Sequence, residues 1–191
     1  MKSLEDKILK EGTVLNSDVL KVGSFLNQQL DVDFITELGK EIADIYEDDC
    51  VTKILTIETS GIPIAFSAGI YIGCPVVFAK KSKSTNVSGN VFSSSVYSFT
   101  HNATYDIVVP CDYLSKNDRV VIVDDFLANG KALDGLIDIV EQSGATLVGC
   151  TCAIEKGFQH GGDKLREKGI RVESLAVIDE MSPGRIIFRC N

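Results

Sequence analysis

Two kinds of apolar pattern alternate along this chain of 191 residues. In one, apolar and mostly β-branched residues follow one another, which is typical of buried strands; in the other they recur every three or four positions, which is typical of helices. The first pattern predicts strands at 53–57, 76–79, 105–109, 119–123, 147–154, 171–178 and, as an edge piece, 186–188. The second predicts helices at 3–11, 33–47, 61–72, 131–143 and 163–168. Strands that alternate with helices predict an α/β fold, a mostly parallel sheet with helices on both faces.

Two segments fit neither pattern. Residues 80–104 are rich in Ser, Thr and Asn; Val91 to Tyr97 would permit a loose hairpin, but the polarity favours a flexible active-site loop outside the core. Residues 1–32 combine a short helix with a stretch at 18–30 whose exposed-looking apolar residues would suit a hood over a ligand. We expect both segments to belong to one domain that spans residues 1–191.

The uncharged run from Gly61 to Ala79 would be long enough to cross a bilayer. Pro63 and Pro75 divide it into a helical part and a strand-like part, so a buried helix followed by a buried strand explains it better. The first seven residues mix both charges and contain no apolar run of the kind found in signal peptides. We therefore expect a cytoplasmic protein without a membrane partner.

Charge and cysteine content exclude further classes of function. The chain has 19 basic and 27 acidic residues, and a net charge of −8 argues against nucleic acid as a partner because Lys and Arg must neutralise its phosphates. A small phosphorylated ligand is compatible, since backbone amides and one or two cations hold such a ligand. The six cysteines are scattered and do not form a usual zinc set with His101 and His160. We expect free, mostly buried thiols.

At the start of the helix 33–47, Asp33 is expected to act as the N-terminal cap.

The most informative polar group follows the strand 119–123. Asp124 and Asp125 end this strand, and a loop of small residues then leads directly into the helix that begins at Lys131. Ligands of open α/β sheets bind beyond the carboxyl ends of strands, and the free N–H groups at the start of a helix suit a phosphate. The two carboxylates would face a sugar diol or a developing positive charge. The same residues also fit an acidic turn in which Asp125 caps the helix.

The thirteen residues from Val120 to Ala132 resemble the signature with which type I phosphoribosyltransferases bind 5-phosphoribosyl 1-diphosphate (PRPP). The resemblance implies that Asp124 and Asp125 are catalytic residues that hold the ribose hydroxyls. It assigns the 5-phosphate to a loop made of Ala128, Asn129, Gly130, Lys131 and Ala132. The commonest form of the signature has Thr or Ser where Ala128 and Asn129 stand, so the phosphate would rely more on backbone amides, Asn129 and Lys131.

Two weaker groups follow the strands 53–57 and 76–79. Thr59, Ser60 and Gly61 would offer backbone N–H groups to the pyrophosphate of PRPP, although such a tripeptide is also common in turns before helices. Lys81 would touch the pyrophosphate at the entrance to the polar loop, although paired lysines also occur on solvated loops. The family resemblance favours the functional interpretation of both, with Lys81 as a third catalytic residue.

A fourth group would select the base. Lys156 could donate a hydrogen bond to the 6-oxo group of a purine and disfavour adenine, whose 6-amino group is itself a donor; the alternative is a surface lysine. Through the segments 20–29, 126–130 and 154–156, the whole chain resembles the bacterial xanthine phosphoribosyltransferase family. That resemblance assigns purine contacts to Leu20, Asn27 and Lys156, with Phe126 packed against the base.

The resemblance implies a homodimeric enzyme of purine salvage that uses xanthine, PRPP and Mg²⁺. The ion would be bound mainly through PRPP, near Asp124 and Asp125, with no direct protein ligand assigned. Two alternatives stay open. Guanine and hypoxanthine share the 6-oxo group, so an enzyme that prefers one of them also fits. A regulator that senses PRPP without catalysis carries the same signature, but it needs a DNA-binding module that the short helical start and the charge of this chain do not favour.

Overall fold

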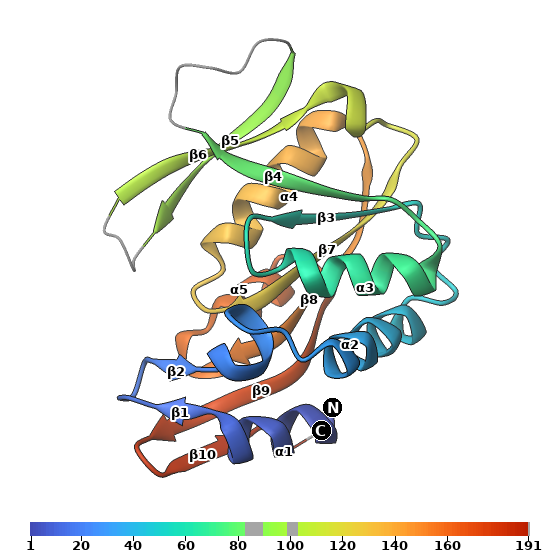
Figure 1. Ribbon diagram of the computed structural model, residues 1–191. Coiled ribbons are helices and arrows are strands. Elements are labelled where there is room, and N and C mark those ends of the chain that lie inside the picture. The colour runs from blue at the N-terminus through green and yellow to red at the C-terminus, as the bar shows by residue number, and fades with distance from the viewer. Residues whose placement is uncertain (83–89, 99–102, 191) are drawn as a thin grey trace.

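The computed structural model describes residues 1–82, 90–98 and 103–190. Its centre is an eight-stranded sheet with the strand order β10-β9-β8-β7-β3-β4-β6-β5 (Figure 1). The strands are β3 (Lys53–Ile57), β4 (Val76–Ser82), β5 (Val91–Ser98), β6 (Ala103–Pro110), β7 (Arg119–Leu127), β8 (Thr146–Lys156), β9 (Val172–Ser182) and β10 (Arg185–Phe188). The helices are α1 (Lys2–Glu11), α2 (Val32–Ile45), α3 (Ile62–Ile72), α4 (Lys131–Ser143) and α5 (Gly161–Glu167). A separate ribbon pairs β1 (Thr13–Val14) with β2 (Leu20–Lys21).

The prediction of a mostly parallel α/β sheet is confirmed. The five central strands from β9 to β4 are parallel, and the outer strands β10, β6 and β5 are antiparallel to their neighbours. Leu55 of β3 pairs with Ile122 of β7, which in turn pairs with Cys150 of β8, and all three side chains are fully buried. Strands covered on both faces bury every side chain, which explains their continuous apolar runs.

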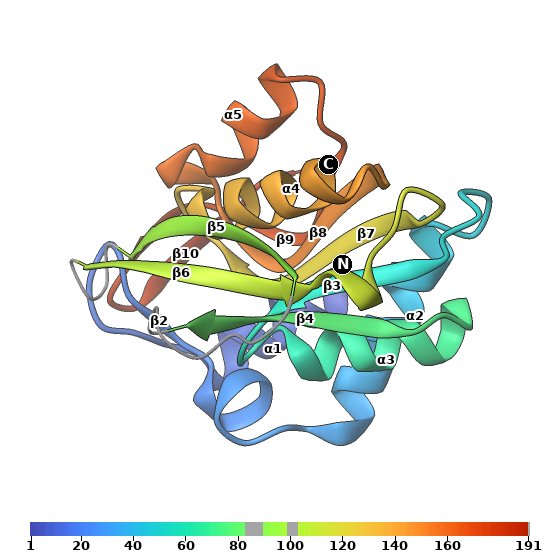
Figure 2. The same ribbon diagram turned by 90° about the horizontal axis from the view of Figure 1, so that it is seen from above.

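Helices cover the two faces of the sheet in separate groups (Figure 2). On one face α1, α2 and α3 form a core with β7, β8 and β9, to which Ile8, Leu38 and Ile64 contribute. On the other face α4 and α5 form a second core, to which Leu136 and Leu165 contribute. The carboxyl ends of the parallel strands meet at one edge of the sheet, where ligands of such sheets bind.

Glycines and a proline mark the ends of two helices where the sequence predicts them. Pro63 lies in the first turn of α3, and Gly144 ends α4 in a left-handed conformation with φ of 73°. The prediction that Asp33 caps the next helix is wrong. Asp31 caps α2, because its Oδ1 accepts a hydrogen bond at 3.2 Å from the N–H of Phe34, three residues further on.

The expectation that residues 80–104 form one polar loop is wrong for much of that segment. Residues 80–82 end β4, 91–98 form β5, and 103–104 begin β6. β5 pairs with β6 over its whole length, and Val96 is only 3% exposed. The rest of the predicted loop, residues 83–89 and 99–102, lies outside the described residues, so its closure over the site stays a prediction.

The N-terminal hood confirms the expectation of exposed apolar residues only at Val19 and Leu30, which are 39% and 42% exposed. Residues 23–27 form a π-helical turn, and Leu20, Val22, Phe25 and Leu26 are buried in the first core. The ring of Phe25 packs edge-on against Phe34 of α2, with 5.8 Å between the centroids. The segment is irregular because it folds against α1 and α2, which supply the apolar surface that its own sequence pattern does not reveal.

The uncharged run at 61–79 forms two elements of the fold. Among the helices of the described residues, none is long and apolar enough to span a bilayer, and the uncharged run 61–79 is α3 followed by β4.

All six cysteines lie in described parts of the chain and are free, as predicted. The expectation that most are buried is wrong, because only Cys150 and Cys152 are fully enclosed.

Candidate active site

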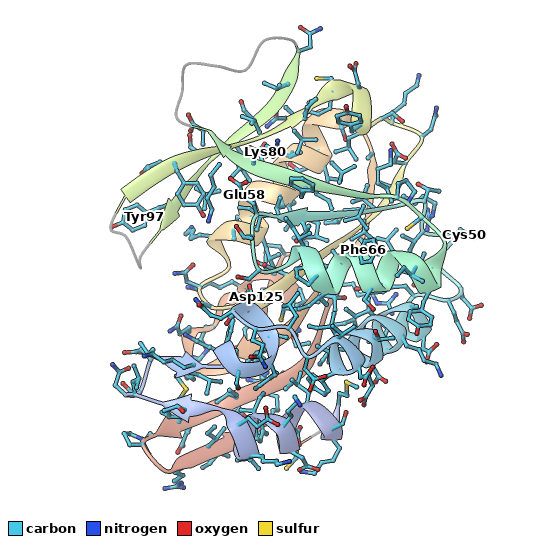
Figure 3. The ribbon with its side chains drawn as sticks, in the orientation of Figure 1. Cys50, Glu58, Phe66, Lys80, Tyr97 and Asp125 are labelled. Carbon is cyan, nitrogen blue, oxygen red and sulfur yellow. The ribbon has the colours of Figure 1, made fainter. Side chains whose placement is uncertain are left out.

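Polar residues gather at one edge of the sheet, where β3 and β7 end. Since these strands are parallel neighbours, the residues that follow β3 lie beside the last residues of β7. Figure 3 shows Glu58 and Asp125 at this edge, whereas Cys50 lies at the opposite edge. A cavity of about 200 Å³ opens at the edge that carries Glu58 and Asp125. It is lined by Ile57, Glu58, Thr59, Ser60, Lys81, Tyr105, Asp124, Asp125 and Ala132.

The two acids of the pair have different surroundings. Asp124 is 6% exposed, and its Oδ1 accepts the N–H of Asp125 at 2.9 Å. Burial, and then the neighbouring charge of Asp125, raise the pKa of the Asp124 carboxyl well above its ordinary value. The Oδ2 of Asp125 accepts a hydrogen bond from Nδ2 of Asn27 at 3.2 Å. A positive charge that develops in the cavity would relieve the cost of keeping both carboxylates ionised.

The turn between β3 and α3 packs directly against this pair. Thr59 and Ser60 line the cavity, and the peptide bond between Glu58 and Thr59 is cis. A Cβ atom at Gly61 would lie 2.4 Å from Oγ1 of Thr56 and 2.9 Å from Oδ1 of Asp124. Glycine is therefore needed for the backbone of this turn to approach the acid pair so closely.

Lys81 lies beside the same cavity, one strand further out. Its backbone N–H donates to Oε1 of Glu58 at 2.6 Å, and its ammonium lies 5.2 Å from the centre of the Tyr105 ring. Glu58 therefore connects the end of β3 to β4. This contact brings Lys81 and the turn 59–61 to one side of the acid pair.

The loop 128–132 lies on the other side, between β7 and α4. Gly130 has a φ of 85°, in the left-handed region, directly before the first residue of the 13-residue helix. The loop and its flanking residues enclose a hollow of about 80 Å³ at the positive end of the helix dipole. The Oδ1 of Asn129 accepts the N–H of Lys131 at 3.1 Å, and the Lys131 ammonium is exposed. Backbone amides and one carboxamide are thus available to an anion, together with the Lys131 ammonium, which lies 3.7 Å from Oδ2 of Asp134.

A third set of groups lies where β8 ends beneath the hood. The Lys156 ammonium donates to the carbonyl of Asp18 at 2.6 Å and lies 5.5 Å from the centre of the Phe126 ring. Partial burial lowers the pKa of Lys156. Leu20 is only 7% exposed, so its side chain belongs to the core. The structure thus brings Asn27, Phe126 and Lys156 to the strand edge that carries the acid pair, with Leu20 behind them in the hood.

Comparison with known proteins identifies the family. The family model described as "Phosphoribosyl transferase domain" matches residues 25–175. The chain belongs to the phosphoribosyltransferase family. A xanthine phosphoribosyltransferase of Lachnoclostridium phytofermentans is 52% identical over 191 residues, which cover 99% of this chain and 98% of that protein. A protein of the same name from Ruminiclostridium cellulolyticum is 53% identical over 188 residues, which cover 98% and 99% of the two chains.

Solved phosphoribosyltransferase structures share the fold at lower identity. The adenine phosphoribosyltransferase of Rhodothermus marinus has a TM-score of 0.73 at 19% identity, covering 93% of this chain and 99% of that one. The adenine phosphoribosyltransferase of Leishmania tarentolae has a TM-score of 0.73 at 20% identity, covering 90% and 86%. At this identity the likeness concerns the type I fold alone.

The described part of this phosphoribosyltransferase contains no cluster of three or more His, Cys, Asp or Glu side chains arranged to hold a metal. Its cavity does present carboxyl groups from Glu58, Asp124 and Asp125. Mg²⁺ is commonly bound through one or two carboxylates together with phosphate oxygens of a substrate. The donor set therefore fits an Mg²⁺ ion that is bound mainly through PRPP.

Three residues at the site were given no role by the sequence analysis. Glu58 directly precedes the Thr-Ser-Gly turn, so its position at a strand end was the available signal. Tyr105 reaches the cavity from β6, whose antiparallel pairing with β4 no local pattern predicts. Asp18 contacts Lys156 through its backbone carbonyl oxygen. Because every residue has this group, the sequence gave no sign of the contact.

Proposed function

We propose that this phosphoribosyltransferase converts xanthine and PRPP to xanthosine 5′-monophosphate and pyrophosphate in purine salvage. One observation supports the proposal most strongly: the acid pair Asp124–Asp125, the loop 128–132 and Lys156 lie together at the carboxyl ends of the strands. The relatives named xanthine phosphoribosyltransferase, 52% and 53% identical over nearly the whole chain, support the choice of base.

In the proposed reaction the three substrate fragments occupy three parts of the site. The amides of residues 59–61 and the Lys81 ammonium hold the pyrophosphate, the loop 128–132 holds the 5-phosphate, and the acid pair holds the ribose hydroxyls. The bond from ribose C1 to the pyrophosphate oxygen breaks, a bond from a ring nitrogen of xanthine to C1 forms, and that nitrogen gives its proton to water. Departure of pyrophosphate leaves positive charge on the ribose, which Asp124 and Asp125 stabilise.

The proposed base selectivity depends on groups that are already hydrogen-bonded within the protein. Lys156 donates to Asp18 and Asn27 donates to Asp125, so the base would replace these partners. The 6-oxo group of xanthine would accept from Lys156 and its 2-oxo group from Asn27. Hypoxanthine has no 2-oxo group, and guanine carries a donor at that position. Phe126 would pack against the base, with Leu20 supporting the hood.

We further propose that Mg²⁺ enters the site with PRPP, next to Asp124 and Asp125. The ion would supply positive charge that offsets the charge of the departing pyrophosphate. The acid pair then has two tasks in this chain: it orients the ribose through its hydroxyls, and it favours a cation in the cavity over an anion.

The assembly and compartment are also proposals. We propose one domain over residues 1–191, with 1–32 as hood and 80–104 at the active site, that forms a homodimer. Exposed apolar side chains on α3 support the homodimer, because Phe66, Ile70 and Tyr71 are 63%, 62% and 46% exposed (Figure 3 labels Phe66). Six free thiols in the described chain support a reducing compartment, the cytoplasm.

Product analysis tests the proposed function. The protein is mixed with PRPP, Mg²⁺ and xanthine, and the nucleotide and pyrophosphate are quantified. We expect equal amounts of xanthosine 5′-monophosphate and pyrophosphate. A variant with Asp124→Asn and Asp125→Asn is the control, and it should fold but form no product. Product formation by this variant at the rate of the unmodified protein would refute the roles of the pair.

A further inference from the structure

The start of α5 lies in backbone contact with the loop 128–132, which we call the phosphate loop (Figure 1 shows α5 beside the start of α4). The N–H of Gly161 donates to the carbonyl of Ala128 at 3.2 Å. A Cβ atom at position 161 would lie 2.2 Å from that carbonyl oxygen and 2.6 Å from the nitrogen of Gly130. Any other residue at 161 would push the loop outward, so Gly161 sets how deeply the loop can sit.

The next glycine makes an equally close contact on the other side of α5. A Cβ atom at Gly162 would lie 2.1 Å from Oε1 of Glu155 and 2.7 Å from Nη1 of Arg166. Glu155 is fully buried, and its two oxygens accept hydrogen bonds from Arg166 at 2.9 and 2.7 Å. The Ser174 hydroxyl also donates to this carboxylate. Two-point pairing fixes a guanidinium in orientation as well as in distance, so α5 is held firmly against β8.

The anchor of α5 is adjacent in sequence to the purine-binding lysine. Successive strand residues point to opposite faces of a sheet, and Glu155 and Lys156 follow this rule. Glu155 contacts Arg166 of α5, whereas Lys156 lies over Phe126 beneath the hood. Residues 155 and 156 of β8 therefore contact two parts of the site. On one face Lys156 lies at the proposed purine subsite, and on the other Glu155 holds α5, which contacts the phosphate loop.

We infer that Gly161, Gly162, Glu155 and Arg166 are positioning residues that fix the distance between the purine and 5-phosphate ends of the site. The inference rests on the proposed function and deepens it. None of the four is placed in contact with substrate. Base and 5-phosphate become parts of one nucleotide in the reaction, so a rigid spacing between their subsites holds the reacting atoms in line.

A pair of glycine substitutions tests this role. Gly161→Ala introduces the clash with the phosphate loop, while Gly149→Ala introduces a Cβ atom 2.8 Å from Oη of Tyr46, at the other end of β8. The readouts are the Kd for PRPP with Mg²⁺ by calorimetry and the KM values for PRPP and xanthine. We expect Gly161→Ala to weaken PRPP binding on the order of 10–100-fold while the KM for xanthine changes little. The control Gly149→Ala should keep the Kd for PRPP of the unmodified protein even if it unfolds at a lower temperature.

Arg166→Lys provides a second, milder variant that keeps the charge beside Glu155 but removes the two-point geometry. We expect a smaller rise in the Kd for PRPP, and this measurement decides the question if Gly161→Ala does not fold. Unchanged PRPP affinity in folded Gly161→Ala, or in Arg166→Lys when the first variant is insoluble, overturns the inference. Absence of xanthosine 5′-monophosphate with the unmodified protein would instead refute the proposed function, and PRPP binding would still test the positioning role.

Discussion

At the residue scale, Asp124 combines burial with a second carboxylate next to it, and both raise its pKa in the folded protein. The folded state therefore binds this proton more tightly than the unfolded chain does. It follows that stability falls as the pH rises from the ordinary pKa of an aspartate, about 3.9, through the raised pKa of the folded state. At neutral pH the buried Asp124 carboxyl therefore lowers the free energy of unfolding, and we attribute its retention to the charge stabilisation proposed for catalysis.

The first prediction is that Asp124→Asn stabilises the protein while it abolishes transferase activity. The Oδ1 of asparagine still accepts the N–H of Asp125, and the buried charge is removed. Thermal unfolding from about pH 4 to 8 should show a higher Tm for the variant at pH 7 and a difference that vanishes near pH 4. The exposed Asp48→Asn serves as the control and should not change the Tm appreciably. A lower Tm for Asp124→Asn at pH 7, or a difference that does not depend on pH, would contradict this account.

The second prediction concerns Lys156. Lys156→Met keeps the apolar stem over Phe126 but removes the ammonium that is proposed to contact the 6-oxo group. A hydrogen bond to a charged donor contributes about 1.5–3 kcal/mol, so the KM for xanthine should rise roughly 10–100-fold while the KM for PRPP changes little. Steady-state kinetics with each substrate varied in turn measures both. The exposed Lys40→Met is the matched control, and an unchanged KM for xanthine in Lys156→Met would exclude the proposed contact.

Sequence reasoning at this scale succeeded where chemistry and backbone position coincide in one segment. Asp124, Asp125 and the loop 128–132 form one continuous motif, so their proximity could be predicted. Gly161 could not be found in this way, because its role depends on a backbone contact with Ala128, which lies more than thirty residues earlier. Glu58 is intermediate: its place after a strand is visible in the sequence, but its bond to the backbone of Lys81 is not.

At the scale of elements, β5 shows how a polar sequence can still form an edge strand with one buried side chain. Val96 is 3% exposed and packs against α4, where a Cβ atom at Gly135 would lie 2.5 Å from its Cγ2. The serines at 93, 94, 95 and 98 gave the segment the composition of a loop. Pairing with β6 and contact with α4 outweigh that local preference, as tertiary contacts often do for strands.

The third prediction tests this packing with a double-mutant cycle. Val96→Ala should destabilise the protein by about 1.5–2.5 kcal/mol through lost burial and a small cavity. Gly135→Ala should also destabilise it, because the steric clash with Val96 outweighs the gain of about 1 kcal/mol in helix propensity. With Val96→Ala present, Gly135→Ala should become neutral or stabilising. Denaturant unfolding of the four proteins measures the coupling, and additive effects would show that β5 does not pack on α4.

Element boundaries were predicted best where one pattern dominated. The strand 53–57 and the start of α4 at Lys131 agree with the structure, because a continuous apolar run and a glycine-marked helix start are strong local signals. The hood was predicted less well, since its apolar residues are buried by α1 and α2 and follow no helical or strand period. The cap of α2 was misassigned because Asp31 and Asp33 offer the same chemistry two residues apart.

At the scale of the whole molecule, the net charge of −8 is unevenly distributed, because the site places lysines next to its carboxyl groups. Lys81, Lys131 and Lys156 lie at the strand edge where the proposed anionic substrates would bind. The acidic surplus is therefore carried by the rest of the surface. Such a distribution fits a small phosphorylated substrate better than a nucleic acid, which needs an extended basic surface.

The fourth prediction concerns assembly. We expect a dimer of 20.7 kDa chains at micromolar concentration, and Phe66→Glu should shift it to monomer by placing a charge in the proposed apolar contact. Sedimentation velocity measures the mass. Leu9 on α1 is 55% exposed, so Leu9→Glu is a matched control that should remain dimeric. A monomeric unmodified protein, or a dimeric Phe66→Glu variant, would contradict the proposed surface.

In the proposed function the site selects xanthine among the 6-oxopurines, and a panel of purine bases measures this selectivity. The initial rate of nucleotide formation is measured for xanthine, guanine and hypoxanthine, each with PRPP and Mg²⁺, and kcat/KM is compared. With Asn27 and Lys156 both donating to the base, xanthine should exceed each of the others by about tenfold or more. A higher kcat/KM for guanine or hypoxanthine than for xanthine would contradict the account.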